Sequence, residues 1–208
     1  MHPNPTYRQQ THAQALDAAN DRGFGFIAAY FEGLSGAHVP FFVEDQRVFL
    51  HLNRANPLAR AATKQAIPAM LVVSLCDAYV SPAWYHMDDQ VPTWLYGAVH
   101  INGFLEVLPD KELEPLLVQL SAKFESRLAP AAPWTMDKLS KQAKDKLMRA
   151  IQPFSLRITA IDATDKFAQT KPAQALASLA PKLEDHSFGS NVDRVAQRVR
   201  HHHRLKTQ

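Results

Sequence analysis

The stretch "HVPFFVEDQRVFLHLN", residues 38–53, contains two runs of apolar and polar residues with a polar step between them. Such runs are typical of β-strands, and Glu44–Gln46 provides a tight turn between the two. Strands joined by so short a connection pair antiparallel, because a parallel pair needs a long crossover that is usually helical. This stretch therefore predicts an antiparallel sheet.

Further strands flank this hairpin on short connections. Before it, "GFGFIAAYFEG" (23–33) reads as a strand that leads into a glycine-rich turn, "GLSGAH" (33–38). After it come three apolar or alternating runs, at residues 66–76, 93–107 and 154–167. Helical patterns cover residues 11–20, 110–128 and 136–151, with Asp110 as the expected N-cap of the second. The order predicts a mainly β protein with flanking helices (α+β), built on a small antiparallel barrel, and argues against a doubly wound sheet.

Composition is that of a globular protein. The 208 residues are 46% hydrophobic and 21% charged, enough for one domain with room for an appendage. No run is long and apolar enough for a transmembrane helix, and the first residues lack the apolar core of a secretory signal, so a cytoplasmic location is expected. Cys76 lies in the apolar run "AMLVVSLC" and is predicted to be a buried core residue rather than a nucleophile.

Positive charge is concentrated at the end of the chain. The net charge is +3, but residues 194–208 alone carry five arginines and lysines and no acid, which leaves −2 for the rest. The body is therefore not a basic nucleic-acid-binding surface, and no motif supports direct DNA binding. The segment "RHHHRLK" (200–206) is predicted to be a disordered tail, with adventitious metal binding by its histidines as the alternative.

The stretch "VFLHLNRANPLARAATKQ", residues 48–65, is a candidate phosphate site. Asn56 followed by Pro57 has the form of a helix N-cap with proline at the first helical position. The helix would present backbone N–H groups and a positive dipole end, with Arg54 just before them and Arg60 inside the helix. A capped helix with a solvated arginine is the alternative.

Aromatic residues crowd "DAYVSPAWYHMDDQVPTWLYGAVH", residues 77–100. Pro82 and Pro92 bracket a predicted loop that holds Trp84 and Tyr85, and the following strand opens with Trp94. Rings in such a loop need a covering partner, which could be the protein's own core, a second subunit or a flat aromatic ligand.

Three histidines, His38, His51 and His100, fall on predicted strands without any metal-ligand spacing. They are expected to be ordinary barrel residues, and no metal site is predicted. A haem ligand at His51 or His100 is the minor alternative. No sequence motif identifies a catalytic residue.

Several segments together resemble a known family. The pieces "HVPFFV", "HLNRANP", "DAYVSPAWY", "VPTWLYGAVH" and "MRAIQPFSLRITAIDATDKFAQTKP" occur in family order between residues 24 and 172. The chain thereby resembles the PaiB-type FMN-binding proteins, also called FMN-binding negative transcriptional regulators. The resemblance implies a six-stranded antiparallel split β-barrel over residues 1–172, with a helical insertion at about 110–150. Residues 173–208 would form a helical or disordered extension.

The resemblance also implies a homodimer with FMN at the subunit interface. The turn at Arg54, Ala55 and Asn56 would receive the phosphate. The ring or ribityl chain would be lined by residues of the aromatic segment, namely Ser81, Trp84, Tyr85, Thr93, Trp94 and Tyr96. The closing segment "KFAQTKP" (166–172) would reach the flavin from the other subunit through Lys166, Gln169 and Lys171. Two features depart from the family pattern: Leu95 replaces the usual asparagine, and the closing segment is one residue shorter and lacks a serine.

The function implied is regulation of transcription through flavin or metabolite binding, by an indirect route. The alternative is an FMN-dependent oxidoreductase that uses NAD(P)H or a small heterocycle, since in flavoenzymes the cofactor carries the chemistry. Haem binding or degradation on the same barrel is a minor alternative.

Overall fold

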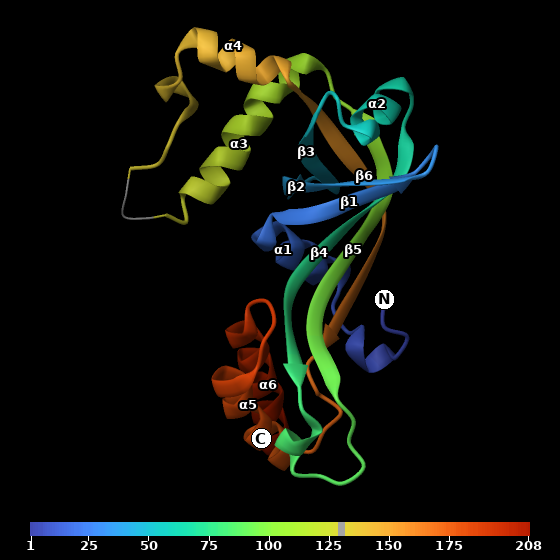
Figure 1. The fold of residues 1–208 in the computed structure, drawn as a ribbon, viewed down its shortest axis with the longest axis vertical. Helices are drawn as coiled ribbons and strands as arrows, with labels where there is room; N and C mark the ends of the chain where they lie inside the picture. Colours follow the sequence, from blue (N-terminus) through green and yellow to red (C-terminus); the bar gives the residue numbers. More distant parts are fainter. Residues whose placement is uncertain (129–131) are drawn as a thin grey trace. The chain divides into compact units, whose positions relative to one another are not determined.

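The computed structural model describes residues 1–128 and 132–208. Its strands are β1 (Phe24–Tyr30), β2 (Leu34–Glu44), β3 (Arg47–Asn53), β4 (Ile67–Val80), β5 (Thr93–Val107) and β6 (Ile151–Lys166). Its α-helices are α1 (His12–Arg22), α2 (Pro57–Lys64), α3 (Leu113–Glu125), α4 (Lys141–Arg149), α5 (Ala173–His186) and α6 (Val192–Thr207), with short 3₁₀ turns η1 (Pro5–Tyr7), η2 (Pro82–Tyr85), η3 (Asp110–Glu112) and η4 (Met136–Lys138). The strands close into a barrel in the order β1-β2-β3-β6-β5-β4, which confirms the predicted fold class. Figure 1 labels these strands and the α-helices along the chain.

The chain forms two compact units. Unit 1 comprises residues 1–18, 73–100 and 162–208, and unit 2 comprises residues 19–72 and 101–161. The long strands β4, β5 and β6 each contribute residues to both.

Unit 2 contains the hairpin on which the fold prediction rests. Asp45 and Gln46 both have positive φ, at 46° and 60°, as a two-residue type I′ turn between β2 and β3 requires. The other predicted turn, "GLSGAH", is wrong in extent. Leu34 already pairs with Tyr30, so the turn is confined to residues 31–33, where Gly33 adopts a φ of 138° that other residues avoid.

Helix α3 packs on β2 and β3 within unit 2. Leu116 and Leu120 are buried against Phe42. The predicted N-cap at Asp110 is wrong, because η3 separates that residue from α3. The Asp110 carboxylate instead pairs with the guanidinium of Arg54.

In unit 1, α5 and α6 form a packed helical pair. The prediction of a disordered "RHHHRLK" tail is wrong, because these residues lie in α6, which buries Val195, Ala196 and Val199 along one face. The link between the two helices is bonded to β4: the amide of Tyr79 donates to the carbonyl of Phe188 at 3.0 Å. A Cβ at Gly189 would lie 2.3 Å from the Asp77 carbonyl oxygen, so this close approach requires glycine.

Cys76 is 2% exposed, and burial raises the pKa of its thiol to about 11. The prediction of an inert core cysteine is therefore confirmed. In the described part of the chain, no helix has both the length and the apolar character needed to cross a bilayer.

Candidate functional site

The predicted ligand-binding residues are divided between the units. Arg54, Ala55 and Asn56 belong to unit 2, and the others, from Ser81 to Lys171, belong to unit 1. Each group forms a coherent local structure.

The turn before α2 has the predicted cap. The Asn56 carboxamide oxygen accepts from the Leu58 amide at 2.9 Å, and Pro57 follows at the first helical position. Other amides of the turn also have acceptors in the chain. The Ala55 amide donates to the Asn53 side chain at 2.8 Å, and the Asn56 amide donates to the Asn53 carbonyl at 2.9 Å. These bonds set the shape of the turn, so an arriving phosphate would have to rely mainly on side-chain cations.

Arg54 is the nearest such cation, and its guanidinium contacts the Asp110 carboxylate at 2.8 Å. It lines an open cavity of about 510 Å³ together with Lys141, Lys144 and Arg149 from α4. Sequence reasoning missed these three residues because they lie nearly a hundred positions downstream. Their proximity to Arg54 is visible only once α4 has folded.

In unit 1, the most distinctive contact joins Lys166 and Thr93. The Lys166 ammonium donates to the Thr93 hydroxyl at 2.7 Å, and burial lowers the pKa of Lys166. Among residues 1–128 and 132–208, no carboxylate forms an ion pair with this ammonium group. A half-buried cation whose partner is a neutral hydroxyl retains its attraction for an anionic ligand.

Lys171 lies beside the aromatic segment. Its ammonium group sits 5.1 Å from the centre of the Tyr85 ring and donates to the side-chain carbonyl of Gln90. Tyr85 itself is 3% exposed, and burial raises the pKa of its phenol to about 12. Lys171 of the closing segment and Tyr85 of the aromatic loop therefore lie side by side within one chain.

The aromatic rings have different environments. Tyr85 belongs to the core, whereas Trp94 is 43% exposed. Trp94 meets Tyr79 and Phe188 edge-on, with ring centres 6.0 and 5.6 Å apart, and Tyr79 stacks on Phe188. Phe188, which comes from the link between α5 and α6, was not predicted. Its role depends on a helical pair that the sequence pattern did not reveal.

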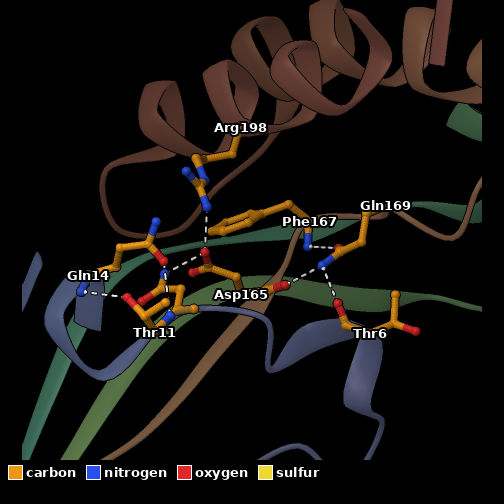
Figure 2. A network of polar contacts seen from close by, with 8 residues as sticks. Thr6, Thr11, Gln14, Asp165, Phe167, Gln169 and Arg198 are labelled. Carbon is orange, nitrogen blue, oxygen red and sulfur yellow. Dashed lines mark hydrogen bonds and ion pairs between the residues drawn. The ribbon is translucent and has the colours of Figure 1, made fainter. Parts of the chain in front are cut away.

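Trp84 and Gln169, which were also predicted to contact the ligand, form hydrogen bonds mainly within the chain. The backbone N–H of Trp84 donates to the Ser81 carbonyl, and the backbone carbonyl of Trp84 accepts from the Ser178 hydroxyl. The side-chain carboxamide of Gln169 accepts from the backbone N–H of Phe167 and donates to the backbone carbonyls of Thr6 and Asp165, as Figure 2 shows. Tyr96 is half-buried on β5.

Leu95 is 1% exposed and lies in the core, on the opposite face of β5 from Trp94 and Tyr96. This burial explains why an apolar residue is suitable at the position where the family usually has asparagine.

Two of the strand histidines have altered acidity. Burial lowers the pKa of His51 and of His100, so both rings are neutral at neutral pH. The Nδ1 atom of His51 is buried and has no hydrogen-bond partner in the described part of the chain.

A family model described as "Putative FMN-binding domain" matches residues 1–160. The chain belongs to this family. The expected flavin cofactor, FMN, is the one that the family description names.

Other proteins are similar to this chain in sequence or in structure. The chain is 29% identical to a Bacillus subtilis protein named "Protease synthase and sporulation protein PAI 2", over 87% of this chain and 88% of that protein. A FAD and haem binding protein from Mycobacterium smegmatis has a similar structure, with a TM-score of 0.56 and 16% identity over 77% of this chain and 73% of that one. The flavocytochrome Anf3 from Azotobacter vinelandii also has a TM-score of 0.56, with 18% identity over 80% and 72%. At these identities the two structures show a shared fold.

The predicted contact residues have the chemistry that FMN requires. FMN carries a phosphate dianion and a flat ring system with carbonyl acceptors. Lys166, Thr93 and Lys171 are donors, two of them cationic, and Trp94 offers an exposed aromatic surface. Arg54 provides a further cation at the turn before α2. The residues therefore fit the group.

Proposed function

We propose that this protein binds FMN between two copies of the chain and regulates transcription in response to the bound flavin or a metabolite. One observation carries the flavin part most directly: the half-buried Lys166 ammonium has a neutral hydroxyl as its partner. Because the ring of FMN gains negative charge on reduction, a nearby ammonium would also favour the reduced cofactor.

An apolar sheet face of unit 2 supports the dimer. Phe24, Phe26, Tyr30 and Leu34 are among the exposed large hydrophobic residues, and Tyr30 and Leu34 are 76% and 83% exposed. Tyr30 and Leu34 are also direct partners across β1 and β2. A groove beside them is lined entirely by uncharged residues, including Met70 and Phe104. A second copy of the chain, with the same apolar surface, is the partner that we infer for this face.

Titration of the flavin-free protein with FMN, followed by quenching of flavin fluorescence, tests the cofactor site. We expect Lys166→Met to weaken FMN binding by about 1.5–3 kcal/mol, the range for a hydrogen bond to a charged group. Lys206→Met is the matched control, because this exposed lysine near the end of α6 lies in the same unit. Unchanged FMN affinity in Lys166→Met would show that the flavin binds elsewhere.

The same flavin-loaded protein separates regulator from oxidoreductase. Under anaerobic conditions, NADH or NADPH should bleach the bound FMN no faster than it bleaches free FMN if the flavin acts as a sensor. Faster bleaching would favour the oxidoreductase alternative and count against the proposed role.

Sedimentation velocity tests the dimer. We expect Leu34→Lys to convert the protein to monomers and to weaken FMN binding, because a charge at this position cannot be buried without a partner. Leu147→Lys on α4 is the control, as Leu147 is also an exposed leucine, at 58%. A Leu34→Lys monomer that retains full FMN affinity would contradict the shared site.

The regulatory role rests on the resemblance to the FMN-binding negative transcriptional regulators, and two ion pairs of the basic segment favour an indirect route. Two arginines of the basic segment are engaged within the chain, Arg198 with Asp165 and Arg200 with Glu184. Cells that lack the gene should therefore regain normal transcript levels with the wild type and with Lys206→Met, but not with Lys166→Met. Full rescue by Lys166→Met would separate regulation from flavin binding.

A further inference from the structure

A cavity of about 380 Å³ lies within unit 1, between the N-terminal segment and α6. Residues of η1 and α1 form one wall and residues of α6 another, with β4 and the segment around Asp165 and Phe167 between them. This volume falls in the range of small-molecule sites, roughly 300–1,000 Å³. Of the residues predicted to contact flavin, Gln169 lines it, and the lining residues from Asp165 onward lie beyond the family match, which ends at residue 160.

The polar network in this cavity is centred on Asp165, which is 9% exposed. Its carboxylate accepts from the Gln10 side chain at 2.5 Å and pairs with the guanidinium of Arg198 on α6. Figure 2 shows Arg198 reaching from the helix toward Asp165, while Gln169 ties the Asp165 carbonyl to Thr6. The single acid among the described lining residues is therefore already neutralised and held in place.

Arg194 adds a second guanidinium to the same wall. Within residues 1–128 and 132–208, no carboxylate forms an ion pair with it. Arg200, on the same helix, differs because it forms a two-point contact with Glu184. The cavity consequently has an excess of positive charge, which favours an anionic occupant.

Two buried polar atoms at this cavity have no partner in the described part of the chain, Gln10 Oε1 and His202 Nε2. The orientation of the Gln10 amide is fixed, because the reverse orientation would direct its oxygen at the Asp165 carboxylate. Burial, followed by the charges of Arg198 and His201, lowers the pKa of His202, so its ring is neutral and can donate or accept. Buried polar groups are normally satisfied, so both atoms call for a partner with hydrogen-bonding groups.

We propose that this cavity binds a small organic anion that also carries a hydroxyl or amino donor. The carboxylate or phosphate of the ligand pairs with Arg194, and its donor bonds to Gln10 Oε1 after a small movement of the side chain. The site is separate from the flavin contacts at Lys166 and Thr93, and it does not depend on FMN.

Calorimetric titration of the full chain with four probes tests the proposal. Succinate, L-malate and L-aspartate share one carbon skeleton and differ by a hydrogen, a hydroxyl or an amino group, and glycerol 3-phosphate represents the phosphate class. We expect malate, aspartate or glycerol 3-phosphate to bind with a Kd below about 1 mM. Succinate should bind at least about tenfold more weakly than malate or aspartate, because it cannot donate to Gln10.

Variants locate the binding. Arg194→Gln should weaken the bound probe roughly 10- to 150-fold, and Arg194→Lys should weaken it less, because it keeps the charge but loses the forked donor. Arg204→Gln is the matched control, since Arg204 is exposed on the same helix and does not line the cavity. Gln10→Met should reduce the preference for malate or aspartate over succinate, and FMN affinity should be unchanged in Arg194→Gln.

Three results would overturn the proposal. The first is that none of the four probes binds below about 1 mM. The second is an equal loss of affinity in Arg194→Gln and Arg204→Gln, which would indicate a general charge effect. The third is equal binding of succinate and malate by the wild type.

Discussion

Glu106 in unit 2 and Lys166 in unit 1 are charged groups with partners of different kinds. In unit 2, Glu106 accepts from Arg157 at 2.9 Å and from Arg47 at 3.0 Å, and the first contact contributes most to the lowered pKa of this carboxyl group. In unit 1, the partner of Lys166 is a neutral hydroxyl, and Arg194 forms no ion pair with any described residue. A charge balanced by an opposite charge contributes to the architecture, whereas an unbalanced one is available to a ligand. By this criterion Lys166 and Arg194 are the cations of unit 1 that remain available to a ligand.

Position 95 offers the strongest test of where the core ends and the aromatic surface begins. We expect Leu95→Asn, which introduces the usual family residue, to lower the free energy of unfolding by about 3–5 kcal/mol. The buried leucine would leave a cavity, and the new amide would lack partners. Val91→Asn, at a position that is 73% exposed, should change stability by less than about 0.5 kcal/mol. Urea denaturation measures both values.

An unchanged stability in Leu95→Asn would mean that this side of β5 tolerates polar groups. Leu95 would then belong with Trp94 and Tyr96 as a residue that faces a ligand, and the distinction between the two faces of the strand would be lost.

Arg54, in unit 2, tests whether a cation that already has a carboxylate partner can still bind a ligand. It is a predicted phosphate ligand and pairs with Asp110. We expect Arg54→Ala to weaken FMN binding by about 1.5–3 kcal/mol. Asp110→Asn should have the opposite and smaller effect, strengthening FMN binding by up to about 1 kcal/mol, because it releases Arg54 from an exposed ion pair. FMN titration of the three proteins provides the measurement.

If Arg54→Ala and Asp110→Asn both leave FMN affinity unchanged, the Arg54–Asp110 pair is purely structural. The phosphate would then be held by other cations, and Lys141 and Arg149 in the same cavity would be the next residues to replace.

The features that the sequence predicted correctly depend on local patterns. The bounds of β5, the turn at Asp45 and Gln46, and the Asn56 cap of α2 follow from alternation, turn geometry and capping within a few residues. The errors involve contacts between distant segments. β2 begins early because Leu34 pairs with Tyr30, and α6 is ordered because its apolar face is buried against α5.

The candidate sites show the same limit. Sequence resemblance selected Thr93 and Lys166 separately, and the structure joins them by a hydrogen bond. By contrast, the cavity that contains Arg194 and Gln10 combines the two ends of the chain. No local pattern could reveal it, because its lining residues come from segments that lie far apart in the sequence.

Lys123 provides the test with the smallest expected effect. It is a half-buried cation of unit 2, and its hydrogen-bond partners are neutral, like that of Lys166 in unit 1. Its ammonium donates to the Asn20 side chain at 2.7 Å and to the Phe41 carbonyl at 3.2 Å, and burial lowers its pKa to about 8. The folded protein therefore loses this proton near pH 8, whereas an unfolded chain retains it until about pH 10.5. Between these values the unfolded state binds more protons, so the contribution of Lys123 makes stability rise with pH.

We therefore expect the difference in unfolding free energy between wild type and Lys123→Met to shift in favour of the wild type as the pH increases from 7.5 to 9.5. Taking the difference cancels the opposing effect of Cys76, whose raised pKa of about 11 makes stability fall over the upper part of this range. The shift should be small, since solvent partly screens the ammonium group. Lys146→Met, at an exposed position on α4, should show no such shift. A difference in unfolding free energy that does not change with pH would show that the hydrogen bonds of Lys123 to neutral partners fully offset its burial. A cation with only neutral partners could then be purely structural.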